Sequence, residues 1–475
     1  MLTLVILLHI YFVSFTDKPE KTAPQLSPRA VEQRAKWNIP TDQMDYPVSG
    51  MYLNELRAKG VKIHHVSRWF NGATCEMDED TAAKIKDLKF VTDVEMTRDN
   101  KKSPPFHAKR RVVEQQWENT KNDGNVTDDQ LRLYNLLKLH EAGYEGQGIL
   151  MAICDGGFGN ADKLDCFKRG EKEELFLGHF DFTDDPYDFF DEGTGNHGTC
   201  CLSSISGIDE SQSYYGAATK ATYYLMRSEE SDTESPKEMD NLVAALEKAD
   251  SLGVNVFSVS LGYYDFDNTE WNYPKSALDG KTSRASRAAT IAARKGILVC
   301  VAAGNEGNKE WQTIGIPADA DSILAVGAVD IEGQIVGFSS HGPSADGRVK
   351  PDVCAVGYQA ALLNVHGDLI YSNGTSFATP LLAGMAASLW SALPNENAMQ
   401  IRERILLSAD RYDHPDPELY GYGIPDAWKA YGRGEGLEVK NFGTEEETPR
   451  KIIRGEQILI IRHGHIYNLA GQLLE

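Results

Sequence analysis

The chain has 475 residues, of which 41% are hydrophobic and 25% are charged. This composition is typical of a globular protein and excludes a mostly disordered or fibrous chain; at about 150 residues per domain it predicts roughly three modules. Acidic residues number 70 and Lys plus Arg number 48, which gives a formal net charge of −22. Because so acidic a surface repels phosphate, nucleic acid is not an expected partner.

The chain begins with an apolar run, residues 1–16, and its first charged residue is Asp17. This run is shorter than the roughly 20 residues that cross a bilayer, and it suits the core of a signal peptide. We therefore expect a signal-like segment over 1–16 and a secreted protein (extracellular, periplasmic or on the cell surface). A buried N-terminal strand is the alternative, less favoured because polar, proline-containing sequence follows directly. No later segment predicts an integral membrane span.

Residues 46–97 have the pattern of a small α+β module. The pattern is a helix, two strands joined by a hairpin turn at Asn71-Gly72, a second helix and a further strand. Residues 98–127 lose this periodicity and carry the basic cluster Lys109-Arg110-Arg111. We interpret them as a linker with an accessible cleavage point; a solvated run of charges is an equally good explanation.

From residue 128 to residue 432, apolar strands alternate with amphipathic helices. Strands that are apolar along their whole length are buried on both faces, and the helices between them cover those faces. The predicted fold class is therefore α/β, a mostly parallel sheet with helices on both faces. The expected strands are Ile149–Cys154, Ala221–Met226, Val254–Ser260, Ile297–Ala302 and Ile323–Val329. Residues 438–475 are expected to be a short C-terminal tail that contains a β-like piece at Gln457–Ile461.

The seven cysteines show no CxxC spacing. They are too few for a disulfide framework and too dispersed for a zinc site, so most are expected to be small buried apolar residues. No metal-ligand set is predicted. The acidic stretch Asp181–Glu192 leaves calcium binding open, because no motif in it fixes a calcium site.

Four polar residues lie at the ends of predicted strands or at the beginnings of predicted helices. Asp155 follows the first strand, Asn305 follows the strand that ends at Ala302, and His197 precedes an apolar run. Ser376 lies among small residues where a helix begins, and the N–H groups of a helix start favour a developing negative charge. Active groups of parallel sheets lie just past the carboxyl ends of strands. Each residue alone recurs by chance as a cap, a core histidine or a turn serine, but the joint pattern is specific.

The order Asp155, His197, Ser376 and the motifs around these residues resemble the subtilisin-like serine peptidases. The motifs are HGT at His197, SVSLG at Ser258–Gly262, AAGN at Ala302–Asn305, FSSHGP at Phe338–Pro343 and GTSFATP at Gly374–Pro380. The match covers about residues 128–432. The module at 46–97 is similar in arrangement to the inhibitory propeptides of such enzymes.

The resemblance implies a secreted serine endopeptidase made as a zymogen, with protein or peptide substrates and its own propeptide as partners. Ser376 would then be the nucleophile, His197 its general base, and Asp155 the group that orients His197. The side chain of Asn305 and the backbone N–H of Ser376 would form the oxyanion hole. No cofactor is certain, and calcium stays open.

The resemblance also implies that Ser260, Leu261 and Gly262 form an edge of the substrate channel. Tyr263 follows where a glycine is frequent, so we expect it to narrow or close the primary specificity pocket. Cys201 falls where some members carry a cysteine beneath the catalytic histidine, and those members are sensitive to heavy metals. Two further departures, Gly156 in place of Ser or Thr and Cys200 in place of a frequent His, remove no catalytic group.

Two other functions are weighed against this one. A catalytically idle subtilisin-fold binding protein is disfavoured, because such relatives usually lose one of the four groups and all four are present here. A nucleotide-binding α/β protein is suggested only by Gly156-Gly157-Phe158-Gly159 after a strand, which is not a GxGxxG motif.

Overall fold

The computed structural model describes residues 7–20, 22–100, 125–169, 175–231 and 233–432, and the strands between residues 450 and 467. The chain forms two compact units, Met1–Glu435 and Gly436–Glu475. The second unit contains an antiparallel sheet of β16 (Arg450–Arg454), β17 (Gln457–Arg462) and β18 (His465–Tyr467). The β-like piece expected at Gln457–Ile461 lies in β17. Apart from these three strands, the predicted tail lies outside the described residues.

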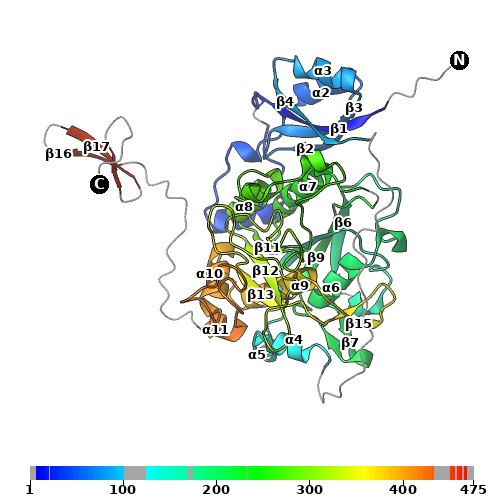
Figure 1. The fold of residues 1–475 in the computed structure, drawn as a ribbon, viewed down its shortest axis with the longest axis vertical. Helices are drawn as coiled ribbons and strands as arrows, with labels where there is room; N and C mark the ends of the chain where they lie inside the picture. The colour runs from blue at the N-terminus through cyan, green and yellow to red at the C-terminus, as the bar shows by residue number, and fades with distance from the viewer. Residues whose placement is uncertain are drawn as a thin grey trace. The chain divides into compact units, whose positions relative to one another are not determined.

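A parallel sheet with the strand order β13-β12-β11-β10-β5-β9-β6 forms the centre of the first unit (Figure 1). Every residue of β5, β10, β11, β12 and β13 is buried, which explains their continuous apolar sequences. The α/β prediction is confirmed. The strands are β5 (Leu150–Asp155), β6 (Phe176–Asp181), β9 (Thr222–Arg227), β10 (Val256–Val259), β11 (Leu298–Ala302), β12 (Leu324–Val329) and β13 (Val353–Val356).

Helices cover both faces of this sheet. On one face α7 (Pro236–Leu252) and α8 (Arg284–Arg294) share a hydrophobic core with the sheet, and on the other α6 (His197–Ser206) and α9 (Thr375–Ala392) share a second one. The remaining elements of this part are α4 (Asp128–Arg132), α5 (Leu136–Glu141), β7 (Ile208–Asp209), β8 (Tyr214–Tyr215), β14 (Ala360–Leu363), β15 (Leu369–Ser372), α10 (Ala398–Ser408) and α11 (Ala427–Gly432). Within the described ranges, no helix combines the length and apolar character needed to cross a bilayer.

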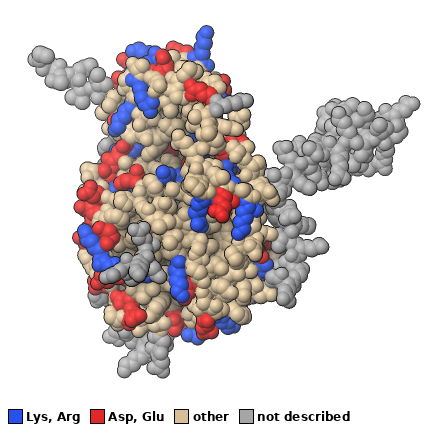
Figure 2. All heavy atoms as spheres, turned by 180° about the vertical axis from the view of Figure 1, so that it is seen from behind, with Lys and Arg blue, Asp and Glu red and all other residues tan. Residues whose placement is uncertain are grey.

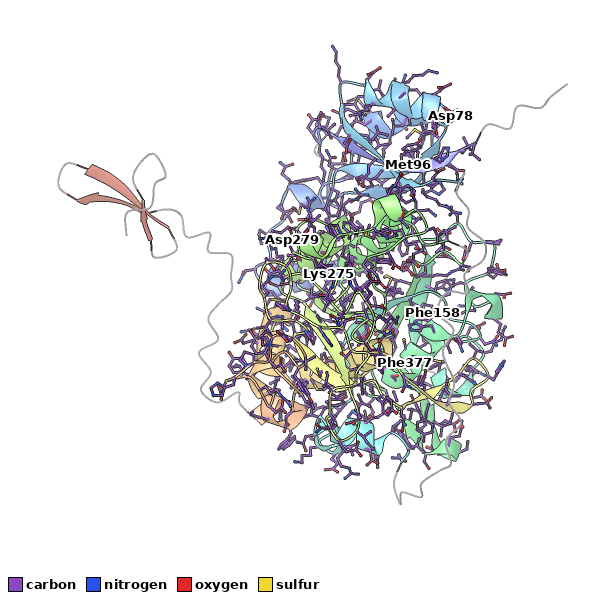
Figure 3. The ribbon with its side chains drawn as sticks, in the orientation of Figure 1. Asp78, Met96, Phe158, Lys275, Asp279 and Phe377 are labelled. Carbon is purple, nitrogen blue, oxygen red and sulfur yellow. The ribbon has the colours of Figure 1, made fainter. Side chains whose placement is uncertain are left out.

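The N-terminal module is a four-stranded antiparallel sheet in the order β2-β3-β1-β4, with α2 and α3 packed on it. Its elements are β1 (His9–Phe15), α2 (Gly50–Ala58), β2 (Lys62–Ser67), β3 (Gly72–Met77), α3 (Glu79–Lys86) and β4 (Val91–Arg98). Strands β1, β2 and β4 also contact α7. In Figure 3, Asp78 and Met96 lie in this module, and Asp78 accepts a hydrogen bond from the Thr81 N–H at the start of α3.

The structure corrects the signal-like segment predicted over residues 1–16. Residues His9–Phe15 form β1, which pairs with β3 on one side and β4 on the other. Tyr11, Val13 and Phe15 enter the module core, while the ring of Phe12 lies 4.3 Å from the guanidinium of Arg284 on α8. A strand buried on both faces has the same apolar composition as a signal core, which is why the sequence pattern was misleading.

The module therefore begins at β1, well before residue 46. Residues 1–6, and residues 101–124 of the predicted linker 98–127, lie outside the described part of the chain. On the face drawn in Figure 2, acidic and basic side chains lie interspersed over the described surface.

Candidate active site

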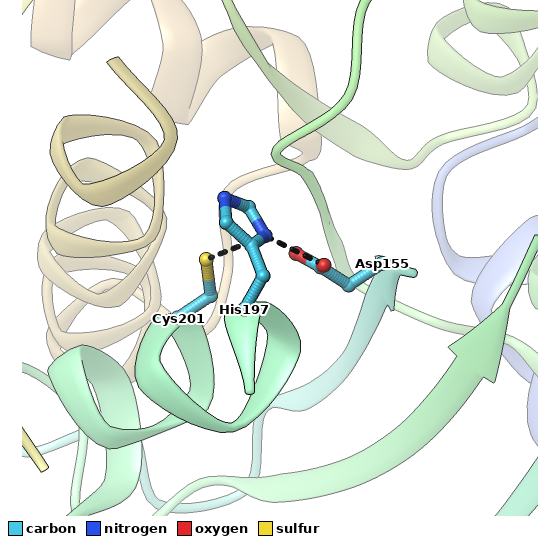
Figure 4. Close-up of side chains that lie close together, drawn as sticks. All are labelled: Asp155, His197 and Cys201. Carbon is cyan, nitrogen blue, oxygen red and sulfur yellow. Dashed lines mark hydrogen bonds and ion pairs between the residues drawn. The ribbon is translucent and has the colours of Figure 1, made fainter. Parts of the chain in front are cut away.

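Asp155 and His197 are joined by a hydrogen bond at the carboxyl edge of the sheet. Asp155 is the last residue of β5, and His197 is the first residue of α6. The Nδ1 atom of His197 lies 2.7 Å from Oδ1 of Asp155 (Figure 4). The aspartate is 1% exposed and the histidine side chain 11% exposed. A buried carboxylate in this position fixes the ring orientation of the histidine and favours the tautomer with the proton on Nδ1.

Two glycines allow this close approach of α6 to the end of β5. A Cβ atom on Gly198 would lie 2.3 Å from the carbonyl oxygen of Gly157, and one on Gly157 would lie 2.1 Å from the carbonyl oxygen of Thr194. Neither position therefore accepts a side chain. The backbone N–H of Gly156 donates to Oδ1 of Asp155 at 2.7 Å, so this carboxylate oxygen also has a backbone partner.

Ser376 is the second residue of α9, where backbone N–H groups lack partners within the helix. Its Oγ donates to the carbonyl oxygen of Ser260 at 3.3 Å, and its own carbonyl oxygen accepts from Oγ of Ser260 at 2.8 Å. The adjacent Phe377, labelled in Figure 3, places its ring 5.7 Å from the imidazole of His197. Ser376 and His197 line the same cavity; a direct proton-transfer contact between such groups often closes only when substrate binds.

Asn305 follows β11 and faces the start of α9. Its Oδ1 accepts hydrogen bonds from the N–H of Thr375 at 2.9 Å and from the Thr375 hydroxyl at 3.0 Å. Since the amide oxygen is turned to Thr375, the NH2 group is directed elsewhere, and Asn305 lines the cavity with Ser376. Thr375 orients this amide; it belongs to the GTSFATP motif, but the motif alone did not predict this role.

The cavity has a volume of about 290 Å³ and includes the predicted channel residues. It is lined by His197, Ser260, Leu261, Gly262, Tyr264, Ala302, Gly304, Asn305, Glu306, Lys309, Gly315, Ser372, Asn373, Thr375, Ser376 and Phe377. Tyr264, Glu306 and Lys309 were not singled out from the sequence. The Tyr264 hydroxyl and the Lys309 ammonium each donate to the carboxylate of Glu306 at 2.9 Å.

The expectation that Tyr263 narrows or closes this cavity is wrong. Tyr263 is 1% exposed and is not among the lining residues. Its hydroxyl donates to Glu229, and its backbone pairs with Ile316 in an antiparallel bridge. The extended backbone turns Tyr263 into the core on the α7 side, and the next residue, Tyr264, faces the cavity instead.

Cys201 lies one helical turn after His197 and is fully buried. Its Sγ is 3.8 Å from Nδ1 of His197 and donates to the Ser376 carbonyl oxygen at 3.3 Å. Burial raises the pKa of this thiol well above its ordinary value, so it is neutral. It therefore packs beneath the histidine and is not a nucleophile.

In the acidic stretch Asp181–Glu192, three carboxylates pair with cations of the protein. Arg227, which is 0% exposed, pairs with Asp181 and Asp185, and Lys237 pairs with Asp184 at 2.6 Å. Calcium prefers an open set of carboxylate and carbonyl oxygens. Asp181, Asp184 and Asp185 therefore already have cationic partners, which disfavours them as calcium ligands; calcium binding stays a prediction.

Comparison with known proteins identifies two regions. The subtilase family of S8 peptidases matches residues 146–423, and the S8 propeptide domain of Bacteroidota matches residues 10–115. Subtilisin DY of Bacillus licheniformis is 31% identical over 291 residues, which is 60% of this chain and 92% of that protein. Serine protease AprX of Bacillus subtilis is 27% identical over 315 residues, 59% of this chain and 66% of AprX.

A solved structure, that of the MycP3 protease from the type VII (ESX-3) secretion system, has a similar fold. The TM-score is 0.52 at 20% identity, and the match covers 69% of this chain and 94% of the other. At this identity the likeness shows the fold alone.

The position of Cys201 predicts sensitivity to mercurials. A mercurial that reaches this thiol should displace or block His197 and stop every reaction that needs the imidazole to accept a proton. Cys201→Ser should then be resistant, as measured by hydrolysis of a peptide substrate before and after treatment. Cys200→Ser is the matched control, because Cys200 is adjacent and equally buried. Equal inhibition of Cys201→Ser and wild type would contradict the prediction.

Proposed function

The chain belongs to the subtilase family and is a serine-type endopeptidase; from this premise we propose that Asp155, His197 and Ser376 are its catalytic triad. The observation that carries the proposal is the 2.7 Å bond between Nδ1 of His197 and Oδ1 of Asp155, made beside a cavity that His197 and Ser376 both line. This is the arrangement that a base needs beside a serine nucleophile.

In the proposed reaction, Oγ of Ser376 attacks the carbonyl carbon of the scissile peptide bond, and its proton passes to Nε2 of His197. The Nδ1–H of His197 donates to Asp155, which stabilises the imidazolium that forms. The C–N bond then breaks, and Nε2–H returns the proton to the leaving amine. Water attacks the acyl-enzyme with His197 again as the base, which releases the carboxylic acid and restores Ser376.

The oxyanion of each tetrahedral intermediate would be held by the NH2 group of Asn305 and the backbone N–H of Ser376. Thr375 supports this role, since its two hydrogen bonds to Oδ1 fix the amide in one orientation. The N-terminus of α9 adds the partial positive charge of its helix dipole. We also assign Ser260, Leu261 and Gly262 to the channel edge, supported by their place in the cavity wall.

The match to an S8 propeptide domain indicates that the chain is made as a zymogen. We propose that the N-terminal module inhibits the peptidase and that cleavage within residues 98–127 separates the two. The end of β4 supports this, because Arg98, Asp99 and Asn100 lie beside Thr233–Ser235 and Asp267–Asn268 of the peptidase part. The described part of the module thus ends against the peptidase part, where the proposed cleavage region begins.

We further propose that the enzyme acts outside the cytoplasm. Family membership supports this proposal, since subtilases are commonly secreted. The apolar start of the chain does not support it, because His9–Phe15 form a central strand of the module.

Replacing Ser376 with Ala should abolish hydrolysis of a peptide substrate and labelling by a fluorophosphonate, because the attacking oxygen is lost. The fold should persist, since only one oxygen is removed, and a thermal melt checks this. If the enzyme cleaves its own linker, the variant should also accumulate at full length. Hydrolysis by a Ser376→Ala preparation free of contaminating protease would contradict the triad assignment. A wild-type protein that is not labelled would favour a catalytically inactive binding protein.

Replacing Asn305 with Leu should lower kcat by roughly 10²–10³-fold with little change in KM, because the amide acts mainly once the oxyanion forms. Steady-state kinetics on a peptide ester or amide measure the two constants. Asn308→Leu is the matched control, since Asn308 is exposed three residues further on. An equal loss in both variants would argue against a specific role for Asn305.

Residues 8–100, supplied in trans, should inhibit a peptidase domain that starts near Asp128. The fragment carries the whole module core, including β1. A fragment of residues 46–97 lacks β1, leaves β3 and β4 without the strand between them, and should neither fold nor inhibit. Circular dichroism and inhibition kinetics test both fragments. A folded 8–100 fragment that does not inhibit even at high micromolar concentration would show that the module is no inhibitor.

A further inference from the structure

Between β1 and α2 the chain leaves the N-terminal module. This excursion contains α1 (Pro28–Lys36) and the short 3-10 helix η1 (Gln43–Asp45); we call residues 27–45 the strap. The hydrophobic core of the module is built from the strands, α2, α3 and Val48, and includes no strap residue. The strap instead contacts the C-terminal ends of α7 and α8 in the peptidase domain.

At the end of α7 the strap supplies hydrogen-bond donors to the last carbonyl groups. The N–H and Oγ of Ser27 donate to Ser251 O at 2.8 Å and to Leu252 O at 3.1 Å, and Nε of Arg29 donates to Gly253 O at 3.0 Å. These carbonyl groups, at the end of the helix, have no hydrogen-bond partner within the helix and need donors from elsewhere. A cation is also favourable here, because a helix C-terminus carries partial negative charge.

Two helix-ending glycines let the strap approach closely. A Cβ atom on Gly253, which ends α7, would lie 2.7 Å from the backbone nitrogen of Ala30, and one on Gly296, after α8, would lie 2.7 Å from Cδ1 of Ile39. Both glycines have positive φ, 74° and 94°, which also suits the end of a helix. The same two positions thus end the helices and leave room for the strap.

A row of buried charges of alternating sign crosses this contact. Lys295 of the peptidase domain pairs with Asp45 of the strap at 2.8 Å, and Arg34 of the strap pairs with Asp45 and with Asp250 of α7 at 2.8 Å. Arg68 of the module binds the second oxygen of Asp250 at 2.5 Å. Arg34, Asp45 and Asp250 are each at most 5% exposed. Removing one member of such a row leaves a buried charge without its partner, which is strongly destabilising.

The strap lies at the opposite edge of the sheet from the candidate active site. Helix α7 leads into β10 and α8 leads into β11, so their C-terminal ends lie at the amino edge of the parallel strands. Asp155 ends β5 at the carboxyl edge, and a strand of six residues spans about 20 Å. No strap residue lines the cavity. The strap contact is therefore separate from the substrate cleft.

From these contacts we propose that the ends of α7 and α8 form a second docking site, specific for the strap, that holds the N-terminal module on the peptidase domain after the linker is cut. The strap precedes the linker in the chain, so cleavage there leaves it attached to the module. Two contacts on one fragment raise the effective concentration of each, and loss of either speeds dissociation. The docking of the strap does not depend on the proposed function. The further claim that a retained module keeps the substrate cleft closed rests on the proposed function.

The test uses the full chain with Ser376→Ala, so that no proteolysis of its own intervenes, and with a recognition site for a sequence-specific protease placed within residues 101–124. After cutting, size-exclusion chromatography measures how much N-terminal fragment stays bound. The dissociation rate is measured by diluting the cut protein into an excess of labelled N-terminal fragment, which replaces the fragment that is released. Arg34→Met in the strap is compared with Arg57→Met in α2. The Arg57 side chain bonds Asn54 of its own helix at 3.0 Å, which makes it a matched control on the same fragment.

We expect Arg34→Met to dissociate at least tenfold faster than the parent, and Arg57→Met to stay within twofold of it. Arg29→Ala, at the other end of the strap, should also accelerate release and serves if Arg34→Met melts at a lower temperature before cutting. Equal rates for the parent and both strap variants would overturn the proposal. Because dissociation is measured directly and not through hydrolysis, the comparison of rates does not rest on the triad assignment. In the chain with Ser376 intact, the delay before full activity should shorten for Arg34→Met, and only that experiment depends on the triad.

Discussion

A carboxylate that is 1% exposed needs donors close by, and Asp155 has two at 2.7 Å: the neighbouring Gly156 N–H and, through a bond to α6, Nδ1 of His197. The bond demands that α6 begin directly against the end of β5. Backbone contacts around Gly157 and Gly198 leave no space for a side chain at either position, so the approach is possible only with glycine there. The placement of Ser376 and Asn305 follows from the same sheet edge, because α9 begins and β11 ends beside it. The geometry of the candidate site thus depends first on the close packing of backbone around these glycines.

The contact between the module and the peptidase domain depends on a related requirement, that buried charges find partners. Glu247 of α7 accepts hydrogen bonds from the Ser67 hydroxyl and the backbone N–H groups of Arg68 and Trp69. Burial nevertheless raises the pKa of Glu247 above its ordinary value. Two carboxylates of α7, Glu247 and Asp250, are therefore satisfied by donors from the N-terminal region, and the two parts of this unit are matched in charge as well as in shape.

The sequence was informative where one residue pattern admits one structure. Continuous apolar runs between amphipathic helices predicted five of the seven strands of the parallel sheet, and β6 and β13 were missed. The edge strand β6 exposes alternate residues, and β13, at the other edge, is only four residues long. The motifs located the four candidate catalytic groups: His197, Ser376 and Asn305 line one cavity, and Asp155 bonds to His197. The failures have physical causes too. A strand buried on both faces has the composition of a signal core, and the side on which Tyr263 or Tyr264 lies is set by local backbone direction, which spacing alone does not reveal.

The direction of the strands and helices in the α/β fold accounts for the positions of both the candidate active site and the strap. At the carboxyl edge of the sheet, α9 presents its N-terminus, whose N–H groups and partial positive charge suit an oxyanion. At the amino edge, α7 presents carbonyl groups and partial negative charge, and there the chain places the Ser27 hydroxyl and the Arg29 guanidinium. An arginine at the first edge would compete with Asn305 for the oxyanion that we propose it binds, and a carboxylate in place of Arg29 would repel the end of α7. The direction of the helices therefore determines which kind of group each edge can bind.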